Sequence, residues 1–180
     1  MNDDRIPRPH EGDVVDLILA DHGLFESLLR ELRDSSADRD RARRDLATLH
    51  VAHAEAEERH VYPRLERKGA IDDDEAEHGE HEHAEAHEAL LAVLELSQTS
   101  GQEFDDAVEQ LTAAISHHLA EEELTILNPA RDEVSDEVRR ELGVTFCDER
   151  ERQIEAGCGD VEVVRRLVEE ARQKGLVDDD

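Results

Sequence analysis

Residues 53–63 read His-Ala-Glu-Ala-Glu-Glu-Arg-His-Val-Tyr-Pro, and residues 118–129 read His-Leu-Ala-Glu-Glu-Glu-Leu-Thr-Ile-Leu-Asn-Pro. Each stretch places a glutamate, Glu57 or Glu122, four residues after a histidine, His53 or His118. On an α-helix this spacing stacks the two side chains on one face, one turn apart. Two such pairs that face each other across a helical bundle would make a metal site.

The chain around these motifs has the pattern of long amphipathic helices. Apolar residues recur at steps of three and four in four segments, which short polar turns join, and no stretch has the pattern of a strand. Pro63 predicts a kink or a loosened last turn in the second segment. Because short turns join antiparallel neighbours, the sequence predicts an all-α, up-and-down antiparallel four-helix bundle. The four helices are expected near residues 11–34, 38–67, 72–98 and 102–129.

The two ends of the chain differ from this pattern. Residues 1–10 are polar and contain prolines, and they predict a flexible N-terminal arm before a bundle at 11–133. Residues 134–180 predict a short helical C-terminal extension, in which we expect no part of the functional site. Its helices are expected from Ser135 to Gly143, from Cys147 to Ala156 and from Asp160 to Lys174.

Histidines occupy core-facing positions near the middle of all four expected helices. The middles of antiparallel helices lie at one height, so these imidazoles and the two glutamates are expected to meet. Buried without partners, such groups would destabilise the fold by several kcal/mol each, whereas bound cations would remove that penalty. Imidazole with carboxylate suits iron, zinc or manganese. The histidines are His22, His53, His83, His87 and His118; the other six are expected at the surface or around the ligands.

Together these motifs resemble the hemerythrin-like (HHE cation-binding) domain family. The resemblance covers about residues 11–130 and implies a centre of two non-haem iron ions with carboxylate bridges. It also implies binding or sensing of O2, or handling of peroxide or nitric oxide. The motifs are Asp21-His22, His53-x3-Glu57-Glu58 with Tyr62-Pro63, Glu82-His83 and His118-x3-Glu122-Glu123.

Carried over residue by residue, the resemblance assigns the metal ligands and makes Glu57 and Glu122 the bridges. Oxygen-carrying hemerythrins place the last carboxylate at the position of Glu123, but the helical stripe here favours Glu122. A second histidine on the third helix, His87, is similar to those oxygen carriers, and many relatives lack it. The implied ligands are His22, His53, Glu57, His83, His87, His118 and Glu122.

Composition argues against two classes of partner. The chain has 49 acidic and 21 Lys or Arg residues, a formal net charge of −28, which argues against nucleic acid and against anionic membranes. No secretory signal or membrane-spanning stretch is evident, so we expect a cytoplasmic protein. Cys147 and Cys158 are expected to be free thiols in a reducing compartment.

Three other functions stay open. The first is a redox enzyme at the same di-iron site, although a metal- and O2-binding protein is favoured over an enzyme. The second is a ferritin-like iron oxidase or store: Glu57-x-x-His60 and Glu80-x-x-His83 have its spacing, but the fourth helix has no such motif. The third is a metal-free acidic interaction module.

Overall fold

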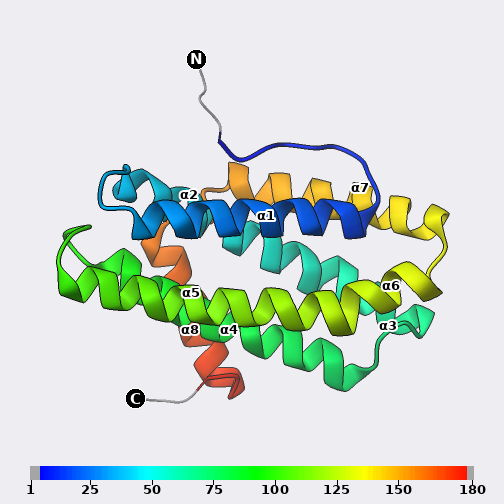
Figure 1. The fold of residues 1–180 in the computed structure, drawn as a ribbon. Helices are drawn as coiled ribbons and strands as arrows, with labels where there is room; N and C mark the ends of the chain where they lie inside the picture. Colours follow the sequence, from blue (N-terminus) through cyan, green and yellow to red (C-terminus); the bar gives the residue numbers. More distant parts are fainter. Residues whose placement is uncertain (1–4, 178–180) are drawn as a thin grey trace.

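The computed structural model describes residues 5–177, and in that range every regular element is helical. Eight α-helices and two single π-helical turns, η1 and η2, form a helical bundle (Figure 1). No helix in the described range is long and apolar enough to cross a membrane. The elements are α1 (Val14–Arg33), α2 (Arg39–Ala56), η1 (Glu57–Val61), α3 (Tyr62–Lys68), α4 (Asp73–Glu95), α5 (Gln102–Glu122), η2 (Glu123–Leu127), α6 (Asn128–Glu133), α7 (Asp136–Glu155) and α8 (Val161–Lys174).

Local capping explains where the first helices begin and end. The side chains of Asp13, Asp38 and Asp72 each accept a backbone N–H from the first turn of the helix that follows. Asp72 also forms a reciprocal capping box with Glu75. Gly69 ends α3 in the left-handed conformation, with φ of 73°. These signals confirm the predicted starts at Asp38 and Asp72 and the predicted stop at Gly69.

The two repeated motifs share a backbone feature that the sequence did not predict. In each motif a π-helical turn comes just before the proline. The N–H of the residue before the proline donates a hydrogen bond to the carbonyl five residues earlier. A proline in an ordinary helix lacks an N–H and crowds the carbonyl four residues back, so an inserted residue relieves the conflict. The predicted kink at Pro63 is therefore a π turn. The fourth helix continues through α6 to Glu133, past its predicted end at Pro129.

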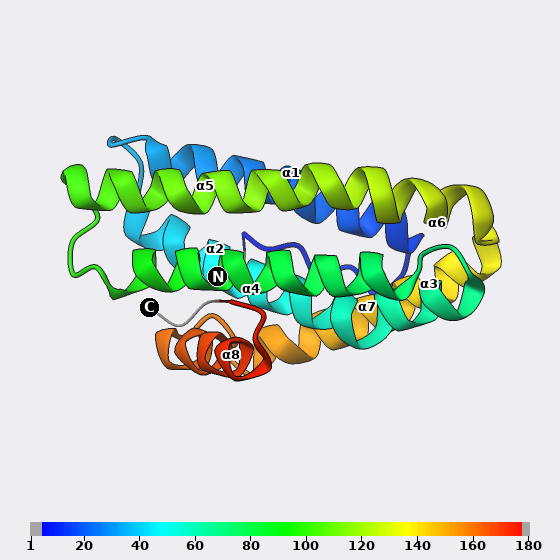
Figure 2. The ribbon, with the colours of Figure 1, turned by 90° about the horizontal axis from the view of Figure 1, so that it is seen from below.

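The core is divided into two apolar clusters with a polar layer between them. One cluster includes Phe25, Leu49, Leu90 and Ile115, and the other includes Ile18 and the apolar side chains of η1 to α3 and η2 to α6. Along α1 and α4 the chain passes from the second cluster to the first, and along α2 and α5 it passes back. Successive long helices therefore run in opposite directions. Figures 1 and 2 show the same arrangement.

The C-terminal extension differs from its prediction. The two short helices expected on either side of Val144 are one continuous helix, α7, which is as long as α1. The break predicted at Gly143 was wrong, because a helical glycine lowers stability only modestly and α7 packs along α1 and α2 at this point. The last helix, α8, crosses α4 steeply (Figures 1 and 2) and begins close to the predicted Asp160.

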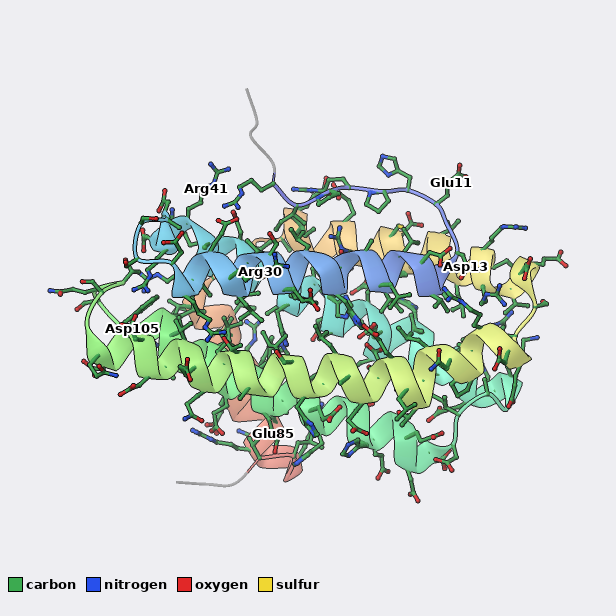
Figure 3. All side chains as sticks on the ribbon, in the orientation of Figure 1. Glu11, Asp13, Arg30, Arg41, Glu85 and Asp105 are labelled. Carbon is green, nitrogen blue, oxygen red and sulfur yellow. The ribbon has the colours of Figure 1, made fainter. Side chains whose placement is uncertain are left out.

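The N-terminal segment also packs more closely than a flexible arm. Ile6 is 5% exposed and joins the apolar core, and the carbonyl of Pro7 accepts a hydrogen bond from α7. The first four residues of the predicted arm lie outside the described residues. Charged side chains cover the outside of the molecule, as Glu11, Glu85 and Asp105 illustrate in Figure 3.

Candidate metal centre

Two buried glutamates form the middle of the polar layer. Glu57, at the start of η1, is 0% exposed, and its Oε2 lies 3.2 Å from His53 Nε2 and 3.3 Å from His83 Nε2. Glu122, at the end of α5, places its Oε2 at 3.1 Å from His22 Nε2 and 3.8 Å from His118 Nε2. The Nε2 atoms of four histidines from four helices therefore converge on two carboxylates.

The other ring nitrogen of each histidine faces an outer carboxylate. These contacts join Nδ1 to a carboxylate oxygen at 2.8 to 3.2 Å. Such an outer carboxylate fixes the orientation of a metal-binding imidazole and increases its basicity. The four pairs are His22 with Glu123, His53 with Asp21, His83 with Glu58 and His118 with Glu82.

Possible ligand atoms gather in two overlapping groups, in each of which all atoms lie within 4.8 Å of one another. The first group combines three histidines with Glu57, and the second combines two histidines with Glu122. Nitrogen and oxygen donors in this arrangement suit iron, zinc or manganese. The groups are His53, Glu57, His83 and His118, and His22, His53 and Glu122.

The inner atoms lack hydrogen bonds that would explain their burial without a cation. The Nε2 atoms of His53, His83 and His118 and the Oε1 atom of Glu57 are buried and form no well-oriented hydrogen bond with the described residues, although the Nε2 atoms of His53 and His83 lie 3.2 and 3.3 Å from Glu57 Oε2. Buried polar atoms are nearly always hydrogen-bonded, so four buried atoms of one cluster without a well-oriented partner are unusual. Two metal ions would satisfy them, and the residues present fit such a pair.

Protonation shows what the site does without metal. Burial acts to lower the pKa of His53 and His83, but Glu57 and the outer carboxylates Asp21 and Glu58 outweigh it, raising the pKa values to about 9 and about 10. Burial acts to raise the pKa of Glu57, yet His53 and His83 hold it well below its ordinary value. Protons on the two imidazoles would balance the charge of the carboxylates when no cation is bound, and binding of metal ions would release these protons.

His87, which the resemblance implied as a ligand, belongs to neither group. Its ring centroid lies 4.8 Å from that of His50, a buried histidine of α2, and its Nε2 has no hydrogen-bond partner. Burial is the main cause that lowers the pKa of His87, to about 4. The structure therefore places this imidazole beside the centre as a neutral neighbour, and its role as a ligand stays a prediction.

Tyr62 lies against the centre, a position that only its place in the motif indicated. Its hydroxyl donates a hydrogen bond to Glu122 Oε1 at 3.1 Å, and its ring stacks on that of His83 at 6.0 Å between centroids. Gly79 leaves room for it, because a Cβ there would stand 3.0 Å from the Tyr62 ring. Burial, followed by the charges of the nearby glutamates, raises the pKa of the phenol well above its ordinary value.

α7 also contacts the centre, contrary to the prediction for the extension. Arg150 donates two hydrogen bonds of 2.8 Å to Asp21, the carboxylate behind His53. The ring centroid of Phe146 lies 5.9 Å from that of His53. No spacing rule in the sequence connects residues this far apart, so these contacts could not have been predicted from the motifs.

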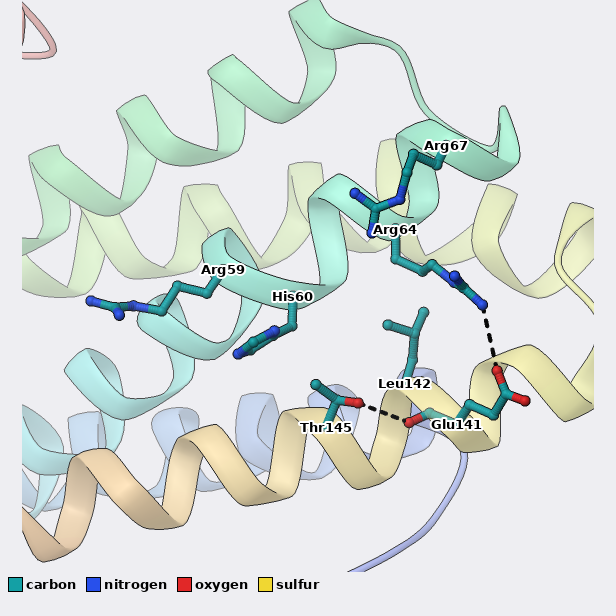
Figure 4. Close-up of a pocket in the computed structure, with 7 residues that line it drawn as sticks. All are labelled: Arg59, His60, Arg64, Arg67, Glu141, Leu142 and Thr145. Carbon is teal, nitrogen blue, oxygen red and sulfur yellow. Dashed lines mark hydrogen bonds and ion pairs between the residues drawn. The ribbon is translucent and has the colours of Figure 1, made fainter.

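A surface pocket of about 300 Å³ lies between α7 and the side of η1 and α3 that faces α7 (Figure 4). Arg59, His60, Arg64 and Arg67 line it from one side, and Glu141 of α7 accepts a hydrogen bond from Arg64 at 3.4 Å. None of these side chains belongs to the two groups of possible ligands. The pocket marks where α7 covers the π turn, outside the metal centre.

Comparison with known families agrees with this geometry. The sequence profile of the hemerythrin HHE cation-binding domain matches residues 13–130. The chain belongs to this family. The match contains all seven predicted ligands, and the family's description as cation-binding agrees with a His and Glu cluster that can hold metal ions. α7 and α8 lie beyond the matched residues.

A protein of Nostoc sp. (strain PCC 7120 / SAG 25.82 / UTEX 2576) described as a DNA nickase is 28% identical over 137 residues. The similarity covers 74% of this chain and 38% of that protein, so the hemerythrin-like chain spans well under half of the relative's length. No solved structure matches the chain.

Proposed function

We propose that this hemerythrin-like protein holds two non-haem iron ions and binds or senses O2 or a related small molecule, such as peroxide or nitric oxide. The up-and-down four-helix unit would consist of α1, α2 to α3, α4 and α5 to α6, within residues 11–133. One observation carries the proposal: four Nε2 atoms face two buried carboxylates, while every Nδ1 is held by an outer carboxylate.

Each inner residue has a role in this proposal. His22, His53, His83 and His118 would hold the ions through Nε2, and Glu57 and Glu122 would bridge them. Iron in such a site supplies reversible electron transfer and open positions for small ligands. Six of the seven implied ligands take part.

The remaining contacts orient the ligands and exclude water. The Phe25 ring centroid lies 5.1 Å from that of His53, and Phe146 covers the same imidazole from α7. Because apolar clusters stand on both sides of the polar layer, the interior around the carboxylates is shielded from bulk water. Such shielding suits a protein that must bind O2 reversibly, because water and protons that reach a reduced site promote its irreversible oxidation.

The proposal is tested by loading the metal-free protein with Fe²⁺ under anaerobic conditions and measuring iron by elemental analysis. We expect about two irons per folded chain. Glu57→Gln should reduce this number, whereas Glu85→Gln, an exposed glutamate of α4, should leave it unchanged. Folded wild-type protein that takes up no stoichiometric iron would contradict the proposal, and Zn²⁺ or Mn²⁺ binding in preference to iron would change the metal.

Oxygen binding is tested on the iron-loaded protein by optical spectroscopy during cycles of air and argon. A spectral change that reverses under argon supports binding or sensing of O2. Catalytic turnover of added peroxide supports the alternative of a redox enzyme. We expect reversible change, because the inner side chains of the centre are buried and apolar clusters stand on both sides of them.

The similarity to a DNA nickase raises the question of nucleic acid, and we propose that this chain does not act on it. A formal net charge of −28 repels the phosphate backbone, and the carboxylates of the centre lie inside the bundle. Incubation of metal-loaded protein with supercoiled plasmid should therefore leave the plasmid unnicked. Metal-dependent nicking that is lost in Glu57→Gln would overturn this expectation.

A further inference from the structure

We propose that α7 supplies a positioning residue to the metal centre: Arg150 holds Asp21, and Asp21 in turn holds the imidazole of His53. The extension would then be part of the working site, although it lies outside the residues that match the family. The expected effect on metal affinity rests on the proposed function. The positioning of Asp21 and His53 rests on the contacts of α7.

The ion pair between Arg150 and Asp21 is buried and fully formed. Arg150 is 2% exposed, and its Nε and Nη2 donate to the two oxygens of Asp21 at 2.8 Å each. A third donor, Nη1, bonds the carbonyl of Pro7 at 2.8 Å. This two-pronged arrangement fixes the plane of the carboxylate, which a lysine with its single ammonium cannot do.

Asp21 passes this fixed geometry to His53. The oxygen Oδ2 of Asp21 that accepts from Arg150 Nε also lies 3.2 Å from His53 Nδ1. With Nδ1 held there, the ring directs Nε2 towards Glu57 at 3.2 Å. His53 is the one histidine that both groups of possible ligands share, so its orientation affects the whole centre.

The other three outer carboxylates have different surroundings. The side chains of Glu58 and Glu123 are 29% and 48% exposed, so water can solvate them, and Glu82 faces the exposed imidazoles of His78 and His117. The side chain of Asp21 is 9% exposed and instead has a buried guanidinium. Removing the guanidinium would take away both of its hydrogen bonds to this buried carboxylate, which destabilises that geometry strongly.

α7 is fitted closely to the bundle at this end. A Cβ on Gly143 would stand 2.0 Å from the carbonyl oxygen of Gly12, so only glycine allows the helix to lie here. One turn further along, Phe146 packs its ring edge against His53. Arg150 follows after another turn on the same face. A row of α7 side chains therefore meets the N-terminal segment, His53 and Asp21 in succession.

The experiment compares Co²⁺ binding to wild-type protein, Arg150→Gln, Arg150→Lys and a matched control. Arg139→Gln is the control, because Arg139 is also a mostly buried arginine of α7 that pairs with an aspartate near α1, Asp13, but contacts no histidine of the centre. Affinity is measured by competition with a chelator, the geometry around the metal by the visible absorption of bound Co²⁺, and fold stability by thermal unfolding of the metal-free proteins.

We expect Arg150→Gln to lower the Co²⁺ affinity about 10- to 100-fold, the range found when the partner of a ligand is removed, and to change the visible spectrum. Arg150→Lys should recover part of the affinity, because it restores the charge but not both hydrogen bonds. Arg139→Gln should lower thermal stability and leave affinity and spectrum as in wild type. If Arg150→Gln does not fold, the inference is tested by comparing the Co²⁺ affinity and spectrum of Arg150→Lys with those of Arg139→Gln.

If Arg150→Gln binds Co²⁺ with wild-type affinity and spectrum, the inference is wrong. Where Arg150→Gln does not fold, the same result for Arg150→Lys overturns the inference. Failure of wild-type protein to bind Co²⁺ or iron would instead contradict the proposed function. The structural part is then decided by a crystal structure of the metal-free Arg150 variant: displacement of Asp21 and His53 supports it, and an unmoved His53 ring overturns it.

Discussion

Tyr62 donates its phenolic hydrogen to Oε1 of Glu122 at 3.1 Å, which links the end of the first repeated motif to the glutamate of the second. The same hydroxyl lies 3.4 Å from Glu57 Oε2. A single buried hydroxyl thus contacts both carboxylates that we propose as bridges, and it leaves the opposite oxygen of Glu122 facing His22.

Tyr62→Phe removes this hydrogen bond while keeping the ring on His83. We expect the free energy of unfolding to fall by about 1 to 3 kcal/mol, because Glu122 Oε1 loses its donor inside the protein. Iron stoichiometry should stay at two, with weaker binding than in wild type. Chemical unfolding and chelator competition measure the two effects. Wild-type stability and affinity in the variant would show that the hydroxyl contributes nothing to the centre.

Glu122 and Glu123 give a second prediction, because the sequence left open which of them bridges the ions. Glu122 is buried and faces two Nε2 atoms, whereas Glu123 is about half exposed and contacts His22 Nδ1 from outside. Glu122→Gln should therefore prevent stoichiometric binding of two irons. Glu123→Gln should keep the stoichiometry and weaken binding by about 10- to 100-fold at most. The reverse order of severity would assign the bridge to Glu123.

His87 provides a third prediction. Since it lies in neither group of possible ligands, His87→Gln should retain two irons per chain by elemental analysis. The matched change on the same helix, His83→Gln, should lose stoichiometric binding, because His83 Nε2 faces Glu57. A loss of iron in His87→Gln as large as in His83→Gln would support the ligand assignment that the family resemblance implied.

The helical fold and most of the inner residues could be predicted because both follow from local spacing. A histidine and a glutamate four residues apart share a helix face whatever the rest of the chain does. Capping by Asp38 and Asp72 likewise depends on neighbours in sequence. His22, His53, His83 and His118 interrupt apolar stripes, and the structure brings these positions together.

The features that the sequence did not predict depend on contacts between distant segments. The π turns arise where a proline meets a helix that tertiary packing keeps continuous, so a kink and a π turn are equally consistent with the sequence. The distinction between His83 and His87 depends on the position of α2, which brings His50 beside His87. The pairing of Arg150 with Asp21 requires the docking of α7, for which the amphipathic pattern gives no partner.

The raised pKa values of His53 and His83 give the last prediction. Both exceed the ordinary histidine pKa, so in the metal-free protein these protons stabilise the fold fully below about pH 6.5, and that stabilisation is lost as pH rises through about 9 and 10. Metal ions bind the deprotonated nitrogens and must release the protons. Between pH 6 and 8 the Co²⁺ affinity should therefore rise with pH, up to about tenfold per unit for each proton displaced. Calorimetry of Co²⁺ binding in buffers of different ionisation enthalpy measures the proton release directly. An affinity that does not change over this range, with no proton released, would contradict the protonation of the metal-free centre.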